Sequence, residues 1–107
     1  MSETDVDEMK EMIKDLPEWL KFDDKTGQYT IETREGKYIM EEQTGEVVKS
    51  CENMAAKLKR SSFEYFLIPR SSIEPKLSDR SLDEMKGSTL FRLKTAMMFI
   101  YGLNELF

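Results

Sequence analysis

Apolar side chains dominate the last 20 residues of the 107-residue chain. Leu90, Leu93, Met97 and Ile100 recur at three- and four-residue spacing, which predicts a long helix over 89–106. A helix that is apolar nearly all round has to be buried, either in the core of the chain or by a partner. The segment is too short for a membrane span. Further apolar residues on the remaining surface of this helix are Phe91, Met98, Phe99, Tyr101 and Leu103.

Spacing and capping signals predict three further helices. One amphipathic helix over 5–16 ends before Pro17, because the residue before a proline is pushed out of the helical conformation. A second helix is predicted over 50–60, and a capping-box pattern at Ser81–Glu84 predicts the start of a third. The two apolar stripes consist of Val6, Met9, Ile13 and Leu16, and of Cys51, Met54, Ala55 and Leu58.

Residues 21–48 are predicted to form a β-meander. Phe22–Tyr29 and Met40–Val47 share one pattern of apolar, acid, acid, any, Thr, Gly, any and apolar residues. The glycine of each segment can take the positive φ that a hairpin turn needs, so we interpret both as turns, with a third turn at Arg34–Gly36. The expected strands are 21–23, 28–33, 37–42 and 46–49.

Aromatic and β-branched residues over 63–68 predict one more strand, which Pro69 ends. A polar loop is expected over 70–80. The resulting fold class is α+β, with a small antiparallel β-meander packed against helices and a long apolar C-terminal helix. The length of the chain favours a single domain over 1–107, with residues 1–5 frayed.

The composition excludes several kinds of site. The chain contains no histidine and one cysteine, so it cannot supply the ligands of a zinc site or an intramolecular disulfide. Neither glycine-rich phosphate-loop pattern occurs, and the usual neutral-pH proton shuttle is missing. An enzyme would have to use carboxylate, lysine or serine groups alone. We therefore expect no enzymatic activity, no cofactor and no metal, and we interpret Cys51 as a small buried hydrophobe.

Charge is unevenly distributed along the chain. Residues 1–48 carry 14 acidic and 6 basic residues, a net charge of −8, whereas residues 49–107 carry 7 acidic and 10 basic residues, a net charge of +3. This segregation is expected either from a solvated surface or from an acidic face that meets a basic partner. The polar, acidic start of the chain and the lone cysteine predict a cytoplasmic protein.

These features favour a non-enzymatic protein-interaction or regulatory domain, such as a viral or inhibitor-like protein. It would bind a protein partner, a second copy of itself, or both, through its acidic N-terminal half, its apolar C-terminal helix, or both. The same helix could instead be purely a core element. The predicted partner-binding residues are Asp5, Asp7, Glu8, Glu11, Leu90, Phe91, Lys94, Met97, Met98 and Tyr101, with Leu103 and Phe107 at the end.

Nucleic-acid binding is the alternative function. Basic side chains neutralise phosphates, and aromatic rings between them can stack on bases, so Tyr65 or Phe66 would be the stacking partners. The basic residues predicted for this role are Lys57, Lys59, Arg60 and Arg70.

Overall fold

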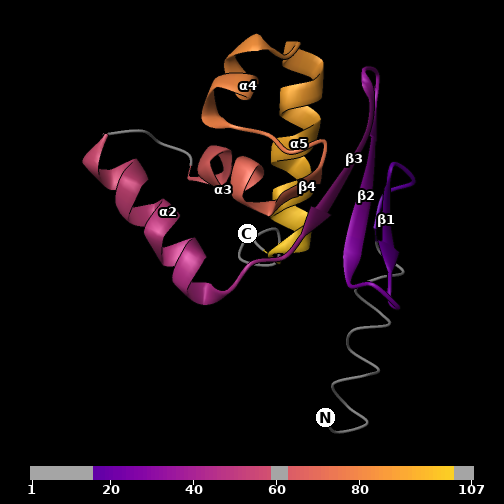
Figure 1. Ribbon diagram of the computed structural model, residues 1–107, viewed down its shortest axis with the longest axis horizontal. Coiled ribbons are helices and arrows are strands. Elements are labelled where there is room, and N and C mark those ends of the chain that lie inside the picture. Colours follow the sequence, from indigo (N-terminus) through magenta and orange to yellow (C-terminus); the bar gives the residue numbers. More distant parts are fainter. Residues whose placement is uncertain (1–15, 59–62, 103–107) are drawn as a thin grey trace, which may run out of the picture.

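The computed structural model describes residues 16–58 and 63–102, which form one four-stranded antiparallel sheet and four helices (Figure 1). The predicted α+β class is confirmed. The predicted helix over 5–16 lies outside the described residues. The elements in chain order are β1 (Leu20–Asp23), β2 (Gln28–Thr33), β3 (Gly36–Glu41), α2 (Gly45–Lys57), α3 (Glu64–Ser71), β4 (Ser72–Glu74), α4 (Asp79–Glu84) and α5 (Gly87–Ile100).

The sheet has the strand order β1-β2-β3-β4. In its register Leu20 pairs with Ile31 and Ile31 with Tyr38, so these three side chains share one face of the sheet. The first two strands are joined by a turn at Gly27, whose φ of 73° suits a residue without a Cβ. The fourth strand returns after two helices and pairs Ser72 with Met40.

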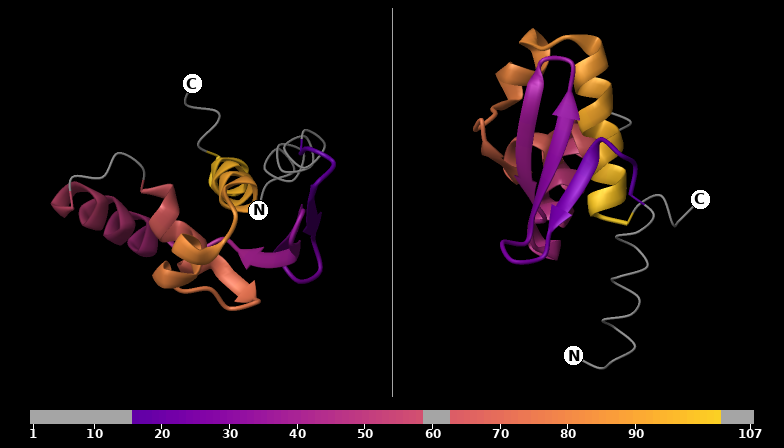
Figure 2. Two further views of the ribbon diagram at one scale, coloured as in Figure 1. Left: turned by 90° about the horizontal axis from the view of Figure 1, so that it is seen from above. Right: turned by 90° about the vertical axis from the view of Figure 1, so that its right-hand side faces the viewer.

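All four helices lie on the same side of the sheet (Figure 2). Helix α5 packs against β2 and α3, and α2 packs against α3 on the side away from the sheet. The other face of the sheet carries mainly polar and charged side chains, as expected for an antiparallel sheet with one solvated face. Among the described residues, no helix is both long and apolar enough to cross a membrane.

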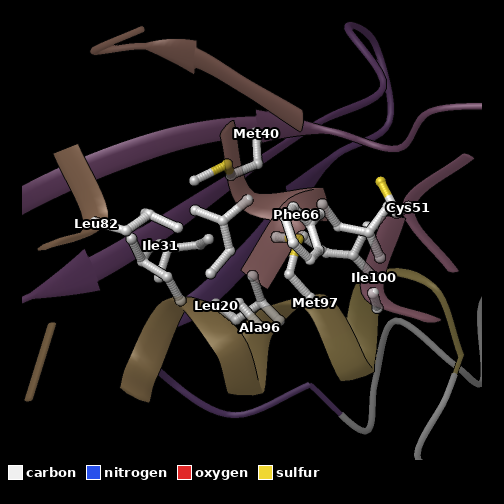
Figure 3. Packing of buried hydrophobic residues seen from close by; sticks show 13 residues of the cluster. Leu20, Ile31, Met40, Cys51, Phe66, Leu82, Ala96, Met97 and Ile100 are labelled. Atoms are coloured by element: carbon white, nitrogen blue, oxygen red, sulfur yellow. The ribbon is translucent and has the colours of Figure 1, made fainter. Parts of the chain in front are cut away.

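The core lies between the sheet, α3 and α5. Ala96 and Met97 of α5 point toward Ile31 and Met40 of the sheet, with Phe66 of α3 beside them (Figure 3). Met97, Ile31 and Met40 are each 0% exposed. Residues at three- and four-residue spacing on α5 therefore do face the core, as the sequence pattern predicts. The buried residues of α5 are Thr89, Leu93, Ala96, Met97 and Ile100.

Two predicted strands are wrong. Residues 46–49 belong to α2, because the half-buried Val47 and Val48 continue the helical stripe of Cys51 and Ala55 instead of alternating across a sheet. Residues 63–68 fall mostly in α3, which is buried between α2 and α5. In such a position almost every side chain can be apolar, so strand propensity no longer indicates a strand.

The boundaries of three other predicted segments need correction. The polar loop predicted over 70–80 contains the last residues of α3 and the whole of β4. The capping box that begins α4 is formed by Ser78 and Ser81, three residues before the predicted one. Helix α5 ends at Ile100, because Gly102 has a φ of 69° and its N–H donates to the carbonyl of Phe99.

Candidate protein-docking groove

A groove of about 490 Å³ lies between the C-terminal end of α2, helix α3, helix α4 and the first half of α5. Phe66 and Leu82 are buried at 9% and 8% exposure, whereas Leu58 is 58% exposed. A large apolar side chain is therefore left open to solvent beside an apolar wall. The lining residues are Leu58, Tyr65, Phe66, Asp79, Arg80, Leu82, Asp83 and Leu90.

The arrangement of the helices explains why the groove is open. Helix α2 packs on α3 through Cys51 and Ala55, which are its buried residues. Leu58 follows one turn after Ala55 and lies on the same stripe, but it is the helix C-cap, and 58% of its surface is uncovered. On the opposite wall, Leu90 projects from α5 and is half-buried.

Tyr65 of α3 and Lys94 of α5 meet beside this groove. The Lys94 ammonium nitrogen lies 5.3 Å from the centre of the Tyr65 ring, within the range of a cation–π contact. Lys94 therefore covers part of the ring. The contact also links α5 to α3 at the side of the groove where Leu90 lies.

Most charges around the groove are paired. The Arg70 Nη1 atom lies 3.7 Å from an Asp79 carboxylate oxygen and also donates a hydrogen bond to the Phe66 carbonyl. On α4, Arg80 Nε lies 3.3 Å from the Glu84 carboxylate. Such exposed pairs contribute little to stability. They do leave the rim without a strong net charge, so apolar contact dominates what the groove offers to a ligand.

The structure separates the residues that the sequence analysis predicted as one contact surface. Leu90 lines the groove and Lys94 lies beside it, whereas Phe91 is 67% exposed and lines a different hollow. Met98 is half-buried. The prediction that Met97 supplies contact area is wrong, because this side chain is 0% exposed and forms part of the core. The predicted residues Asp5, Asp7, Glu8, Glu11, Leu103 and Phe107 lie outside the described residues.

Tyr101 is engaged inside the protein. Its hydroxyl oxygen lies 2.7 Å from the Ser71 hydroxyl oxygen and accepts a hydrogen bond of 2.9 Å from the backbone N–H of Gln43. Burial raises the pKa of Tyr101 above the ordinary tyrosine value. The hydroxyl therefore joins the end of α5 to the end of α3 and to the segment before α2. The ring of Tyr101 is half-buried, and its role in partner binding stays a prediction.

The basic residues of the alternative hypothesis do not form a free patch within the part of the chain that the structure describes. Lys57 is exposed at the end of α2, but Arg70 is half-buried and engaged with Phe66 and Asp79. Phe66 is buried, so it offers no face for a base to stack on. Lys59 and Arg60 lie outside the described residues.

The thiol of Cys51 does not line the groove. Cys51 is 0% exposed, and burial raises the pKa of its thiol, although the nearby Arg70 acts in the opposite direction. Within residues 16–58 and 63–102, no group of three cysteine, aspartate or glutamate side chains is placed to hold a metal ion.

Five of the residues that line the groove were not predicted as site residues, namely Leu58, Asp79, Arg80, Leu82 and Asp83. The spacing places Leu58 on a helical stripe, but spacing alone does not tell which end of a stripe is covered.

Comparisons with known proteins found no matching family model, no matching curated protein and no matching solved structure.

Proposed function

We propose that the chain is a protein-interaction domain whose groove between α2, α3, α4 and α5 binds the apolar face of an amphipathic helix from a protein partner. The observation that carries this proposal is the 58% exposure of Leu58 beside a groove lined by Phe66, Leu82 and Leu90. Exposed apolar surface next to a concave apolar wall is typical of a docking site. The lone cysteine agrees with a cytoplasmic setting for this interaction.

The walls of the groove favour a helical ligand. All four lining elements are helices or helix ends, and helices satisfy their backbone hydrogen bonds internally. None of the lining residues that the structure describes belongs to a strand, so these walls offer no strand edge to which an extended peptide could add. A peptide that enters it has to satisfy its own backbone N–H and C=O groups, which a helix does.

The paired rim charges indicate which helix fits. Because Arg70 and Arg80 already have carboxylate neighbours, a strongly acidic peptide gains little from the rim. Affinity should come from two or three apolar side chains at three- and four-residue spacing on the ligand helix. Leucine, methionine and aromatic residues are the side chains that such grooves take.

A selection experiment tests the proposal. A library of helical peptides with randomised apolar faces is selected on the wild-type protein, and the dissociation constants of the enriched peptides are then measured on variants. Leu58→Glu is the first variant, because the residue is exposed enough for the fold to survive. Phe91→Glu is the matched control, since it makes the same chemical change at a more exposed residue outside the groove.

We expect Leu58→Glu to weaken binding strongly and Phe91→Glu to leave it unchanged. Full burial of a leucine contributes about 1.5–3 kcal/mol, so covering the exposed part of Leu58 contributes roughly 1–2 kcal/mol. A carboxylate at the same place must also lose water, which brings the expected weakening to at least about tenfold. Equal affinities for wild type and Leu58→Glu would contradict the proposal.

Light scattering over a dilution series decides whether the occupant is a second copy of the chain. If the wild-type protein and the Leu58→Glu variant are both monomers, the result agrees with a separate partner. A wild-type dimer that Leu58→Glu converts to a monomer would show that the groove serves self-association, and the proposal of a separate partner helix would be wrong.

A further inference from the structure

A second hollow, of about 190 Å³, lies on another flank of α5. We call it the arginine notch. The end of β2, the turn before β3 and the first turns of α5 form its walls. Its lining residues are Thr33, Arg34, Ser88, Phe91 and Arg92, and it shares none of them with the docking groove.

Two guanidinium groups give the arginine notch its charge. Arg92 donates a hydrogen bond of 3.1 Å from Nη1 to the Glu32 carbonyl, and its guanidinium carbon lies 4.9 Å from the centre of the Trp19 ring. Both contacts hold the group in place without neutralising it. Arg34 is exposed in the turn. Among the described residues, neither arginine lies within salt-bridge distance of a carboxylate, since the ion pairs there involve other residues.

Hydroxyl groups complete the polar wall. The Thr33 hydroxyl is occupied, because it donates to the Gly36 carbonyl and accepts from the Glu35 N–H, and this fixes the turn that carries Arg34. The Ser88 hydroxyl is exposed and has no hydrogen-bond partner among the residues described. It can therefore donate to a ligand at the same place that the two guanidinium groups flank.

Glu35 follows Arg34 in the turn that forms part of this wall. Its carboxylate accepts a hydrogen bond of 2.9 Å from the Lys86 backbone N–H, which directs it to the start of α5. The pKa of Glu35 is lowered, first by the Thr89 hydroxyl and then by that N–H and the Lys86 charge. The charges of the Glu35 carboxylate and the Lys86 ammonium group cancel. Arg34 and Arg92 therefore leave the surroundings of the notch with a positive charge.

We infer that the arginine notch binds a phosphomonoester group whose organic part lies against the exposed ring of Phe91. Arginine presents a planar fork of N–H donors that matches a phosphate, and hydrogen bonds between charged groups are about twice as strong as neutral ones. Phe91 is 67% exposed and lines the same hollow, so it can cover an apolar or aromatic group attached to the phosphate. This inference does not depend on the docking groove.

The size and charge favour a monoester over a nucleic-acid strand. A hollow of about 190 Å³ holds one phosphate with a small adjoining group, whereas a diester backbone needs an open path on both sides. A phosphomonoester carries up to two negative charges, which matches two guanidinium groups. The net charge of −5 on the whole chain repels a polyanion.

Titration followed by backbone NMR shifts tests the inference, with inorganic phosphate, phenyl phosphate and dimethyl phosphate as probes. We expect saturable shifts at Arg34, Ser88 and Phe91, with phenyl phosphate the tightest ligand and dimethyl phosphate the weakest. Phe91→Ala should remove the advantage of phenyl phosphate over inorganic phosphate. Absence of saturable shifts at millimolar phenyl phosphate would overturn the inference, and so would equal binding of dimethyl phosphate or a short single-stranded oligonucleotide.

Charge variants separate a specific site from general attraction. Loss of one charge-assisted hydrogen bond weakens binding by about tenfold, which is the expected effect of Arg34→Gln on phenyl phosphate. Arg34→Lys, which keeps the charge, should lose less. Arg80→Gln is the matched control, because Arg80 is an exposed arginine on α4 outside the notch. Equal weakening by Arg34→Gln and Arg80→Gln would overturn the inference. Leu58→Glu should leave phenyl phosphate binding intact.

Discussion

Replacing Tyr101 with phenylalanine should destabilise the fold without affecting any surface contact. The substitution removes one oxygen and leaves the ring in place. That oxygen lies 2.7 Å from the Ser71 hydroxyl and 2.9 Å from the Gln43 backbone nitrogen. Ser71 is 0% exposed, so water cannot replace the lost partner there.

The expected loss follows from these two contacts. A typical intramolecular hydrogen bond contributes about 1 kcal/mol net, and a buried polar group left without a partner costs about 1–3 kcal/mol. We therefore expect Tyr101→Phe to lower the free energy of unfolding by about 2 kcal/mol. With a urea m-value of about 2 kcal/mol/M, the unfolding midpoint falls by about 1 M.

Urea denaturation followed by circular dichroism measures this loss. Tyr38→Phe is the matched control, because Tyr38 is half-buried and its hydroxyl makes no hydrogen bond to the residues that the structure describes. Its expected loss is below about 0.5 kcal/mol. If Tyr101→Phe lowers the free energy of unfolding no more than Tyr38→Phe does, the Tyr101 hydroxyl does not join these three segments. A loss of partner binding at unchanged stability would return Tyr101 to the contact surface.

Alkaline pH gives an independent check on Tyr101. Burial raises its pKa above the ordinary value of 10.0, so the folded state holds this proton more tightly than the unfolded state does. Stability is therefore full below that ordinary value and falls as the pH rises through the raised pKa. Tyr101→Phe should make the alkaline loss shallower. Some loss remains, because burial also raises the pKa of Tyr29 and Tyr38.

Three further changes test the core, the start of α5 and the lone thiol. Met97→Ala should lower the free energy of unfolding by about 2–5 kcal/mol in urea denaturation, because it leaves a cavity in a fully buried position. Glu35→Gln should destabilise the fold at neutral pH, because Thr89 and Lys86 hold the pKa of this carboxyl low. The melting temperatures of the variant and the wild type should converge as the pH falls through that lowered pKa. Cys51 should react with a thiol reagent roughly four-thousandfold more slowly in the folded than in the unfolded chain, because a stability of about 5 kcal/mol keeps it covered.

Each of these outcomes has a clear contrary result. A loss with Met97→Ala no larger than with the half-buried Met98→Ala would contradict the burial of Met97. A constant difference between Glu35→Gln and wild type over the acid range would mean that the carboxylate charge does not stabilise α5. Equal labelling rates for Cys51 in folded and urea-unfolded protein would place the thiol at the surface.

Local pattern predicted the first three strands closely. Residues 28–33 alternate between apolar and polar side chains, and the strand occupies that same range. A strand repeats every two residues whatever lies opposite it, so a short window of sequence carries this information. The glycine at position 27 marked the first turn correctly, and its positive φ suits a residue without a Cβ. The same pattern around Gly45 was wrong as a turn, because Gly45 begins α2.

Helix α3 shows where local pattern fails. Phe66, Leu67, Ile68 and Pro69 are all buried, so the segment has no polar face from which a helical period could be recognised. Its composition resembles that of a buried strand. Only the packing of α2 on one side and α5 on the other explains why this segment is a helix.

The candidate sites were only partly predictable for a related reason. The sequence identified Leu90 and Lys94 as surface contributors, but it grouped them with Met97, which is buried, and with Phe91, which lies in the arginine notch. Adjacent residues on a helix point about 100° apart, so they meet different neighbours.

By itself, the sequence determined the α+β class, the positions of three strands, the apolar stripe of α5 and the lack of histidine, because these depend on residue type and on spacing along the chain. Tertiary structure decided that Leu58 stays open while Met97 is covered, that the Tyr101 hydroxyl is used internally, and that Arg34 and Arg92 share one hollow. Exposure and proximity depend on what packs opposite a residue, and those neighbours come from elements far away in the sequence.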